Sequence, residues 1–72
     1  MEDNDIEMYF RFRLQQLMKR KSISQEWLSK HIGASERTIN NYLSGRSIPS
    51  FTTVVKIANV MNCSVDDFCY KE

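Results

Sequence analysis

Only three residues in this chain are glycine or proline, and they limit where a helix can continue. Gly33 and Gly45 can adopt the positive φ that ends a helix, and Pro49 lacks the amide N–H that a helix interior requires. Between these residues apolar side chains recur every three or four positions, and no alternation typical of a strand occurs. The sequence therefore predicts an all-α fold. Because the chain has 72 residues, we expect one small domain over 1–72, with its core over about 6–70.

Serines stand directly before four of the five expected helices, where a hydroxyl oxygen can accept a hydrogen bond from a first-turn amide. The first helix instead starts within the sequence Asn4-Asp5-Ile6-Glu7, which we interpret as a capping box. The expected helices cover 6–21, 25–32, 36–44, 51–61 and a short segment after Ser64. The side chains expected to face the core are Ile6, Phe10, Leu14, Leu17, Met18, Leu28, Ile32, Ile39, Tyr42, Leu43, Phe51, Val54, Val55, Ile57, Ala58, Met61, Val65 and Phe68.

The charges are unevenly distributed, although the net charge is only +1. Segment 11–56 carries +7, whereas residues 1–10 carry −4 and residues 57–72 carry −2. A basic body between acidic ends is typical of a protein that binds a polyanion. The charge pattern therefore indicates nucleic acid as a candidate partner.

The two expected helices on either side of Gly33 have the spacing of a helix-turn-helix unit over about 25–44. Position 29, where the helices would cross, must be small, and it is occupied by Ser29. Ile39 and Tyr42 would pack the second helix against the first. The polar residues left on the outside of this second helix are Glu36, Arg37, Thr38, Asn40 and Asn41.

That outward set is typical of a surface that reads DNA bases. Arginine can donate two hydrogen bonds to guanine, and asparagine can make the same kind of paired bond to adenine. A nine-residue helix is about 13 Å long and fits the major groove of B-form DNA. We therefore expect the helix over 36–44 to lie in the major groove of double-stranded DNA and to select its sequence.

Residues 22–50 resemble the lambda-repressor-like DNA-binding domains of the Cro/C1 type, also called the XRE family. The resemblance rests on the spacing of five features: Gln25, Gly33, Ile39, Gly45 and Pro49-Ser50. It extends over about 10–68 and implies a compact five-helix domain. It also implies base contacts by Glu36, Arg37, Asn41 and Asn40, and phosphate contacts by Gln25, Ser35, Thr38, Arg46, Lys19 and Arg20.

The chain departs from the family pattern at several positions. Met18 and Leu43 stand where many members place an arginine and a glutamate that pair with each other, so both charges are replaced together. Ser29 replaces a frequent alanine. Glu36 repels phosphate but can accept a hydrogen bond from cytosine, which would sharpen specificity. Trp27 stands at a position that is usually polar; it would cover Tyr9 or Phe12, or belong to an interface.

The leading functional hypothesis is a transcriptional regulator of the repressor kind, which binds as a homodimer to two half-sites about 34 Å apart. The alternative is an antitoxin-like or protein-interaction module on the same fold, with a protein partner. Surplus apolar residues motivate that alternative, and they are Met8, Phe12, Trp27 and Tyr70.

Other classes of function find little support in the residues. The chain has a single histidine, His31, and no glycine-rich phosphate loop, which argues against an enzyme. Cys63 and Cys69 lack the spacing of a zinc or redox pair, so we expect no metal and no cofactor. The acidic start and the absence of a long apolar run predict neither a signal peptide nor a membrane span. We expect a cytoplasmic protein.

Overall fold

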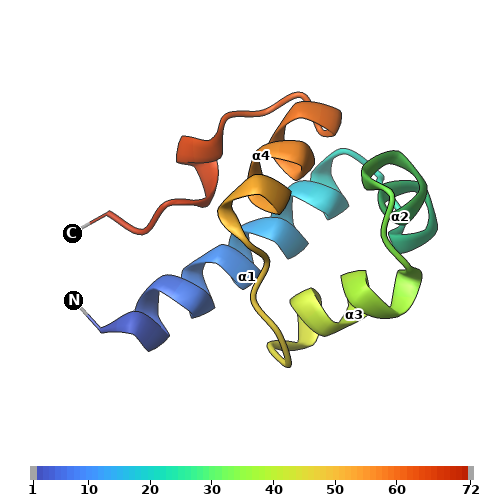
Figure 1. Ribbon diagram of the computed structural model, residues 1–72. Coiled ribbons are helices and arrows are strands. Elements are labelled where there is room, and N and C mark those ends of the chain that lie inside the picture. Colours follow the sequence, from blue (N-terminus) through green and yellow to red (C-terminus); the bar gives the residue numbers. More distant parts are fainter. Residues whose placement is uncertain (1, 72) are drawn as a thin grey trace.

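Four α-helices and one 3₁₀ helix make up the fold in the computed structural model, which describes residues 2–71 (Figure 1). These described residues contain no strand. The predicted all-α class is therefore confirmed. The elements are α1 (Asp3–Arg20), α2 (Gln25–Ile32), α3 (Glu36–Ser44), α4 (Phe51–Val60) and the 3₁₀ helix η1 (Val65–Phe68).

The bounds of α2 and α3 agree with the sequence prediction, and α1 differs at its start. α1 begins three residues earlier than expected, so Asn4 lies inside the helix and the predicted capping box is wrong. Its amide Nδ2 donates to the sulfur of Met8 at 3.4 Å instead. Asp3 and Asp5 in the first turn favour the early start, because carboxylates are stabilised at the positive end of the helix dipole.

The short fifth helix expected after Ser64 forms as the four-residue 3₁₀ helix η1, so the structure has four α-helices and not five. Ser64 caps it as predicted: its hydroxyl oxygen accepts from the amide of Asp66 at 3.1 Å, and its own amide donates to Asp67 Oδ2 at 3.0 Å. The chain becomes extended again at Cys69. Four residues between this cap and the extended segment leave no room for a second α-helical turn.

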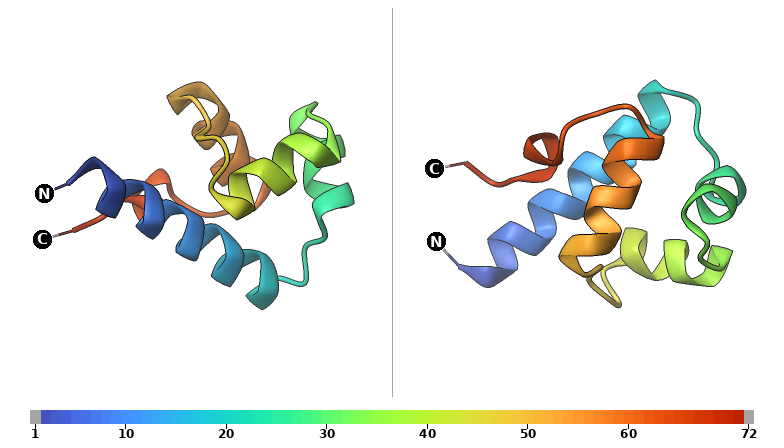
Figure 2. Two further views of the ribbon diagram at one scale, coloured as in Figure 1. Left: turned by 90° about the horizontal axis from the view of Figure 1, so that it is seen from below. Right: turned by 45° about the horizontal axis from the view of Figure 1, so that its top comes forward.

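One core joins the four α-helices. Each contributes a side chain with no accessible surface: Leu14, Leu28, Ile39 and Ile57. The ring of Phe68 packs against Phe10 with centroids 5.4 Å apart, and this contact holds η1 on α1. In Figures 1 and 2 the start of α1 and the segment after η1 lie at one end of the molecule, and α2 and α3 lie at the other end.

Two residues expected in the core lie at the surface. Phe51 is 74% exposed at the start of α4, and Ile6 is 39% exposed near the start of α1. Both have the correct helical spacing. They lie in the first turns of their helices, beyond the point where the neighbouring elements cover the apolar face.

Both glycines have the left-handed conformation that ends the preceding helix, but their surroundings differ. Gly33 has φ of 72° and nothing within 4 Å of where a Cβ would be. Gly45 has φ of 83°, and the guanidinium of Arg11 occupies that space. We expect Gly33→Ala to lower the free energy of unfolding by about 1 kcal/mol, which is the cost of a Cβ at positive φ.

Gly45→Ala should lower the free energy of unfolding by a similar amount, because the atoms that a Cβ would meet are the far end of the flexible Arg11 side chain, which can move aside. Urea unfolding followed by circular dichroism measures both variants, and Gly33→Ala is the matched control. A loss several times larger for Gly45→Ala would contradict the free displacement of the Arg11 side chain.

Candidate nucleic-acid interface

The start of α3 is fixed by the turn before it, which depends on a left-handed glycine and a serine N-cap. α2 ends at Gly33 in the left-handed conformation, and Ser35 then adopts an extended backbone as the N-cap of α3. The Ser35 hydroxyl accepts from the amide of Thr38 at 3.1 Å and hydrogen-bonds the Thr38 hydroxyl at 2.9 Å. The amides of Glu36 and Arg37 precede the first intrahelical bond, so they are free to face an anion.

Ser29 lies at the buried contact between α2 and its neighbours. Its residue surface is 5% exposed, and its hydroxyl donates to the carbonyl oxygen of Glu26 at 2.8 Å. The hydroxyl is therefore satisfied within α2. A serine is tolerated here because it is small and its polar atom is not left without a partner.

One side of α3 is held in the protein and the other is open. Ile39 is fully buried, and Tyr42 and Leu43 are half-buried against the core. Glu36, Arg37 and Asn40 are exposed, and Thr38 and Asn41 are half-buried at the edge. Within residues 2–71, none of the side chains of Glu36, Arg37, Asn40 and Asn41 takes part in a hydrogen bond or salt bridge. This polar edge is therefore available to a ligand.

The end of α3 is tied to the loop that follows it. The carbonyl oxygen of Asn41 accepts from the amides of Gly45, Arg46 at 3.0 Å and Ser47 at 3.3 Å. The Ser44 hydroxyl also donates to it at 3.3 Å. This cluster of hydrogen bonds keeps exposed Arg46 next to the last turn of α3.

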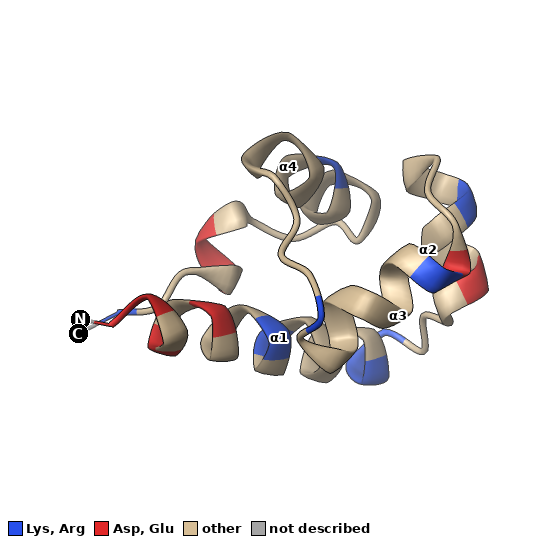
Figure 3. Cartoon of the chain, turned by 60° about the horizontal axis from the view of Figure 1, so that its bottom comes forward, with Lys and Arg blue, Asp and Glu red and all other residues tan. Residues whose placement is uncertain are grey.

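The remaining candidate phosphate contacts lie on other elements. Gln25 is the first residue of α2 and is half-buried, whereas Lys19 and Arg20 are exposed in the last turn of α1. Within the described chain, no side-chain hydrogen bond or salt bridge joins these three residues to α3. Figure 3 shows Lys and Arg on all four α-helices and on the loop after α3, whereas Asp and Glu colour the first turns of α1, α2, α3 and η1.

Two polar residues of α1 contact the end of α3, and the sequence did not identify them. Gln15 Nε2 donates to the carbonyl oxygen of Leu43 at 2.9 Å, and the guanidinium of Arg11 lies over Gly45. Arg11 and Gln15 are four residues apart and share a helix face, which is the one sequence signal that relates them. Met18 is buried and Leu43 packs against the core, so apolar side chains occupy the positions of the family's ion pair.

Trp27 does not cover Tyr9 or Phe12, so that alternative is wrong, and its place in an interface stays a prediction. Its ring stacks on His31 of the same helix, with centroids 3.7 Å apart and planes inclined by 17°. Residues four apart on a helix lie above one another, which explains the pairing. Tyr9 packs edge-on against Tyr70 at 5.8 Å instead, and Phe12 is 57% exposed.

No other chemical centre forms in the part of the chain that the structure describes. Residues 2–71 bring together no group of three histidine, cysteine, aspartate or glutamate side chains that could hold a metal ion. Burial, with the nearby Asp67 carboxylate, raises the pKa of the Cys63 thiol, which keeps it protonated at neutral pH. Within the same residues, no helix is both long and apolar enough to cross a bilayer.

Comparison with protein families gave a match that covers most of these elements. A family model described as helix-turn-helix matches residues 14–68, from the middle of α1 to the end of η1. The match contains all of α2, α3 and α4. Comparisons with curated proteins and with solved structures gave no significant match.

Proposed function

The chain belongs to the helix-turn-helix family, among the DNA-binding regulators of the Cro/C1 type, and on this premise we propose that it is a sequence-specific repressor that binds double-stranded DNA. The observation that carries the proposal is the open polar edge of α3, opposite the fully buried Ile39. A helix that is held on one side and polar on the other can enter the major groove without rearrangement. Such pre-organisation lowers the cost of binding.

In this proposal α2 and α3 form the helix-turn-helix unit, and α3 is the recognition helix. Arg37 donates two hydrogen bonds to a guanine, and Asn41, with Asn40 beside it, bonds an adenine. Glu36 accepts from the amino group of a cytosine. It has no salt-bridge partner within residues 2–71, so its carboxylate is available for that role.

Phosphate contacts supply most of the affinity in this proposal. Ser35 and Thr38 lie at the N-terminus of α3, where free amides attract an anion. Arg46 binds the backbone from the loop after α3. Gln25 adds a contact at the start of α2, and Lys19 and Arg20 add long-range attraction from α1. The proposal includes no catalytic step and no cofactor, and the repressor acts in the cytoplasm by occupying DNA that the polymerase needs.

Selection from a library of random duplexes tests this function. We expect a short consensus to be enriched, and binding to weaken steeply with salt, because bound phosphates release counterions. An enriched pool with no consensus would contradict sequence-specific recognition. No salt-dependent binding to any duplex at low salt would contradict DNA binding altogether.

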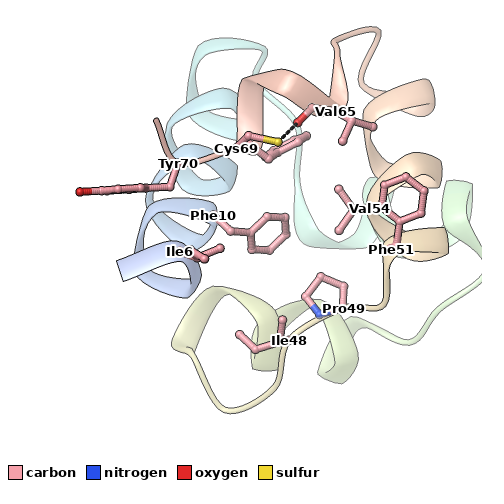
Figure 4. Close-up of a pocket in the computed structure, with 10 residues that line it drawn as sticks. Ile6, Phe10, Ile48, Pro49, Phe51, Val54, Val65, Cys69 and Tyr70 are labelled. Atoms are coloured by element: carbon pink, nitrogen blue, oxygen red, sulfur yellow. Dashed lines mark hydrogen bonds between the residues drawn. The ribbon is translucent and has the colours of Figure 1, made fainter. Parts of the chain in front are cut away.

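An apolar groove beside the recognition helix supports binding as a homodimer. The groove has a volume of about 310 Å³ and begins at Ile48 and Pro49, in the loop that leaves α3 (Figure 4). Phe51, Ile48 and Tyr70 at its margin are 74%, 48% and 37% exposed. We propose that a second copy of the chain fills this groove with its own Phe51, since a two-fold axis brings the same patch of both copies together.

A dimer that forms only on DNA can rely on a small contact between its two copies. Interfaces below about 1,200 Å² are weak by themselves, but adjacent half-sites hold two copies at a high effective concentration. We expect the selected consensus to be an inverted repeat bound by two copies. Phe51→Ser should shift the complex towards one copy per duplex, as measured by analytical ultracentrifugation.

The control for this experiment is Phe12→Ser, because Phe12 is also an exposed phenylalanine but lies outside the groove. A non-repeated consensus bound by one copy would contradict the homodimer. That result would favour the second candidate function, in which the groove binds a different protein and the chain acts as an antitoxin-like or adaptor module.

A further inference from the structure

Two arginines that are far apart in the sequence flank Gly45. The guanidinium of Arg11, on α1, occupies the space where a side chain at position 45 would begin. Arg46 follows Gly45 directly and is exposed. Neither arginine forms a salt bridge with any of residues 2–71. Two positive charges on adjoining elements, neither of them in a salt bridge, favour an anionic ligand near them.

The face of α1 that carries Arg11 contacts the end of α3. Gln15, one turn later on α1, donates to the carbonyl oxygen of Leu43 at 2.9 Å and fixes α1 against the last turn of α3. The last carbonyls of a helix carry partial negative charge, which favours a cation beside them. Arg11 is half-buried, and its guanidinium lies beside Gly45.

Gly45 leaves room for this arrangement. A Cβ at position 45 would collide with the guanidinium of Arg11, the far end of a flexible side chain, which would then have to move aside. The positive φ of 83° explains a glycine here on backbone grounds alone. Arg11 also fills the space beside Gly45, whereas nothing lies within 4 Å of a Cβ at Gly33.

We propose that Arg11 binds a DNA phosphate and forms, with Arg46, one clamp on the sugar-phosphate backbone beside the C-terminal end of α3. This inference rests on the proposed binding of DNA by α3 and extends that interface onto the middle of α1. A guanidinium can donate two parallel hydrogen bonds to one phosphate. The two arginines therefore fit one phosphate each on the same strand, or neighbouring oxygens of one phosphate.

Replacing Arg11 by methionine tests the clamp, because it keeps most of the stem and removes the charge. We expect the slope of log affinity against log salt to fall by about one unit and affinity at 0.1 M salt to fall about tenfold. The affinity for consensus duplexes and the affinity for random duplexes should fall by the same factor. Arg11→Lys keeps the charge and should preserve the slope. Fluorescence anisotropy with labelled duplexes measures all of these values.

The matched control is Arg13→Met, two residues along the same helix. Arg13 donates from Nε to the carbonyl oxygen of Asp67 at 2.8 Å and also bonds Gln16, so it points to η1. We expect this variant to lower the melting temperature and to leave the salt slope unchanged. If the unmodified protein binds DNA and Arg11→Met has the same slope of log affinity against log salt, the clamp is overturned. The proposed DNA binding by α3 would then still stand.

A second measurement needs no variant. In the unmodified protein, NMR should show the Nε–Hε signals of Arg11 and Arg46 shifting together as a random 12-base-pair duplex is added, with the signal of Arg13 unmoved. A fixed Arg11 signal during a titration that moves Arg46 would overturn the clamp. No movement of any arginine signal at low salt would overturn the proposed DNA binding and the clamp with it.

Discussion

Arg37→Ala is expected to remove the discrimination among bases at one position of the DNA site. A good paired contact between arginine and guanine is worth about 1–3 kcal/mol of discrimination, which is about 5- to 150-fold in relative affinity. Arg37 is exposed and bonds no other described residue, so its removal should leave the stability of the fold unchanged. Competition binding against duplexes with each base at the affected position measures the loss.

Arg46→Ala is the control that separates recognition of the bases from binding to the phosphates. Arg46 lies in the loop after α3 and is proposed to contact phosphate, so its loss should weaken all duplexes by the same factor and reduce the salt slope by about one unit. Equal weakening of consensus and scrambled duplexes by Arg37→Ala would contradict the base contact and assign Arg37 to the phosphates instead.

Ile39→Ala is expected to destabilise the whole domain, with the largest effect on folding among these predictions. Ile39 is fully buried and is the side chain through which α3 joins the core. Truncating a buried isoleucine to alanine costs about 2–5 kcal/mol, because it removes apolar contacts and leaves a cavity. A domain of this size has little stability in reserve, so a large fraction should be unfolded at 37 °C. Thermal unfolding followed by circular dichroism measures the change.

Ile48→Ala provides the matched substitution at an exposed site. Ile48 is 48% exposed in the loop after α3, so the same truncation should cost well under 1 kcal/mol in the dilute protein without DNA. Similar melting temperatures for the two variants would contradict the burial of Ile39. Loss of specific binding by Ile39→Ala at temperatures where it remains folded would show that the packing of α3 also sets its angle in the groove.

The positions of the helices were largely predictable because their ends depend on nearby residues. Ser24, Ser35 and Ser50 each accept a hydrogen bond from an amide three residues later, at 3.0, 3.1 and 3.2 Å. The two glycines end α2 and α3 as expected. The start of α1 was not predictable from its cap, because the Glu2 side chain makes no capping bond there and the helix extends to Asp3.

The candidate site was predictable only in part. The outward set on α3 follows from its 3.6-residue period, once Ile39 is known to face inward. The contribution of α1 was not predictable, because Gln15 and Leu43 are 28 residues apart and no local pattern relates them. The exposure of Phe51 was missed for a similar reason, since helical spacing identifies an apolar face but not how far other elements cover it.

The sequence by itself determined the helical class, the helix ends at Gly33 and Gly45, and the polar edge of α3. These features follow from φ preferences, capping and helical period, which act over four residues or fewer. Only the tertiary structure decided that Arg11 lies across Gly45 and that Arg13 reaches Asp67, which is 54 residues away. Contacts of that kind depend on how whole helices pack, and packing is settled by the shared core.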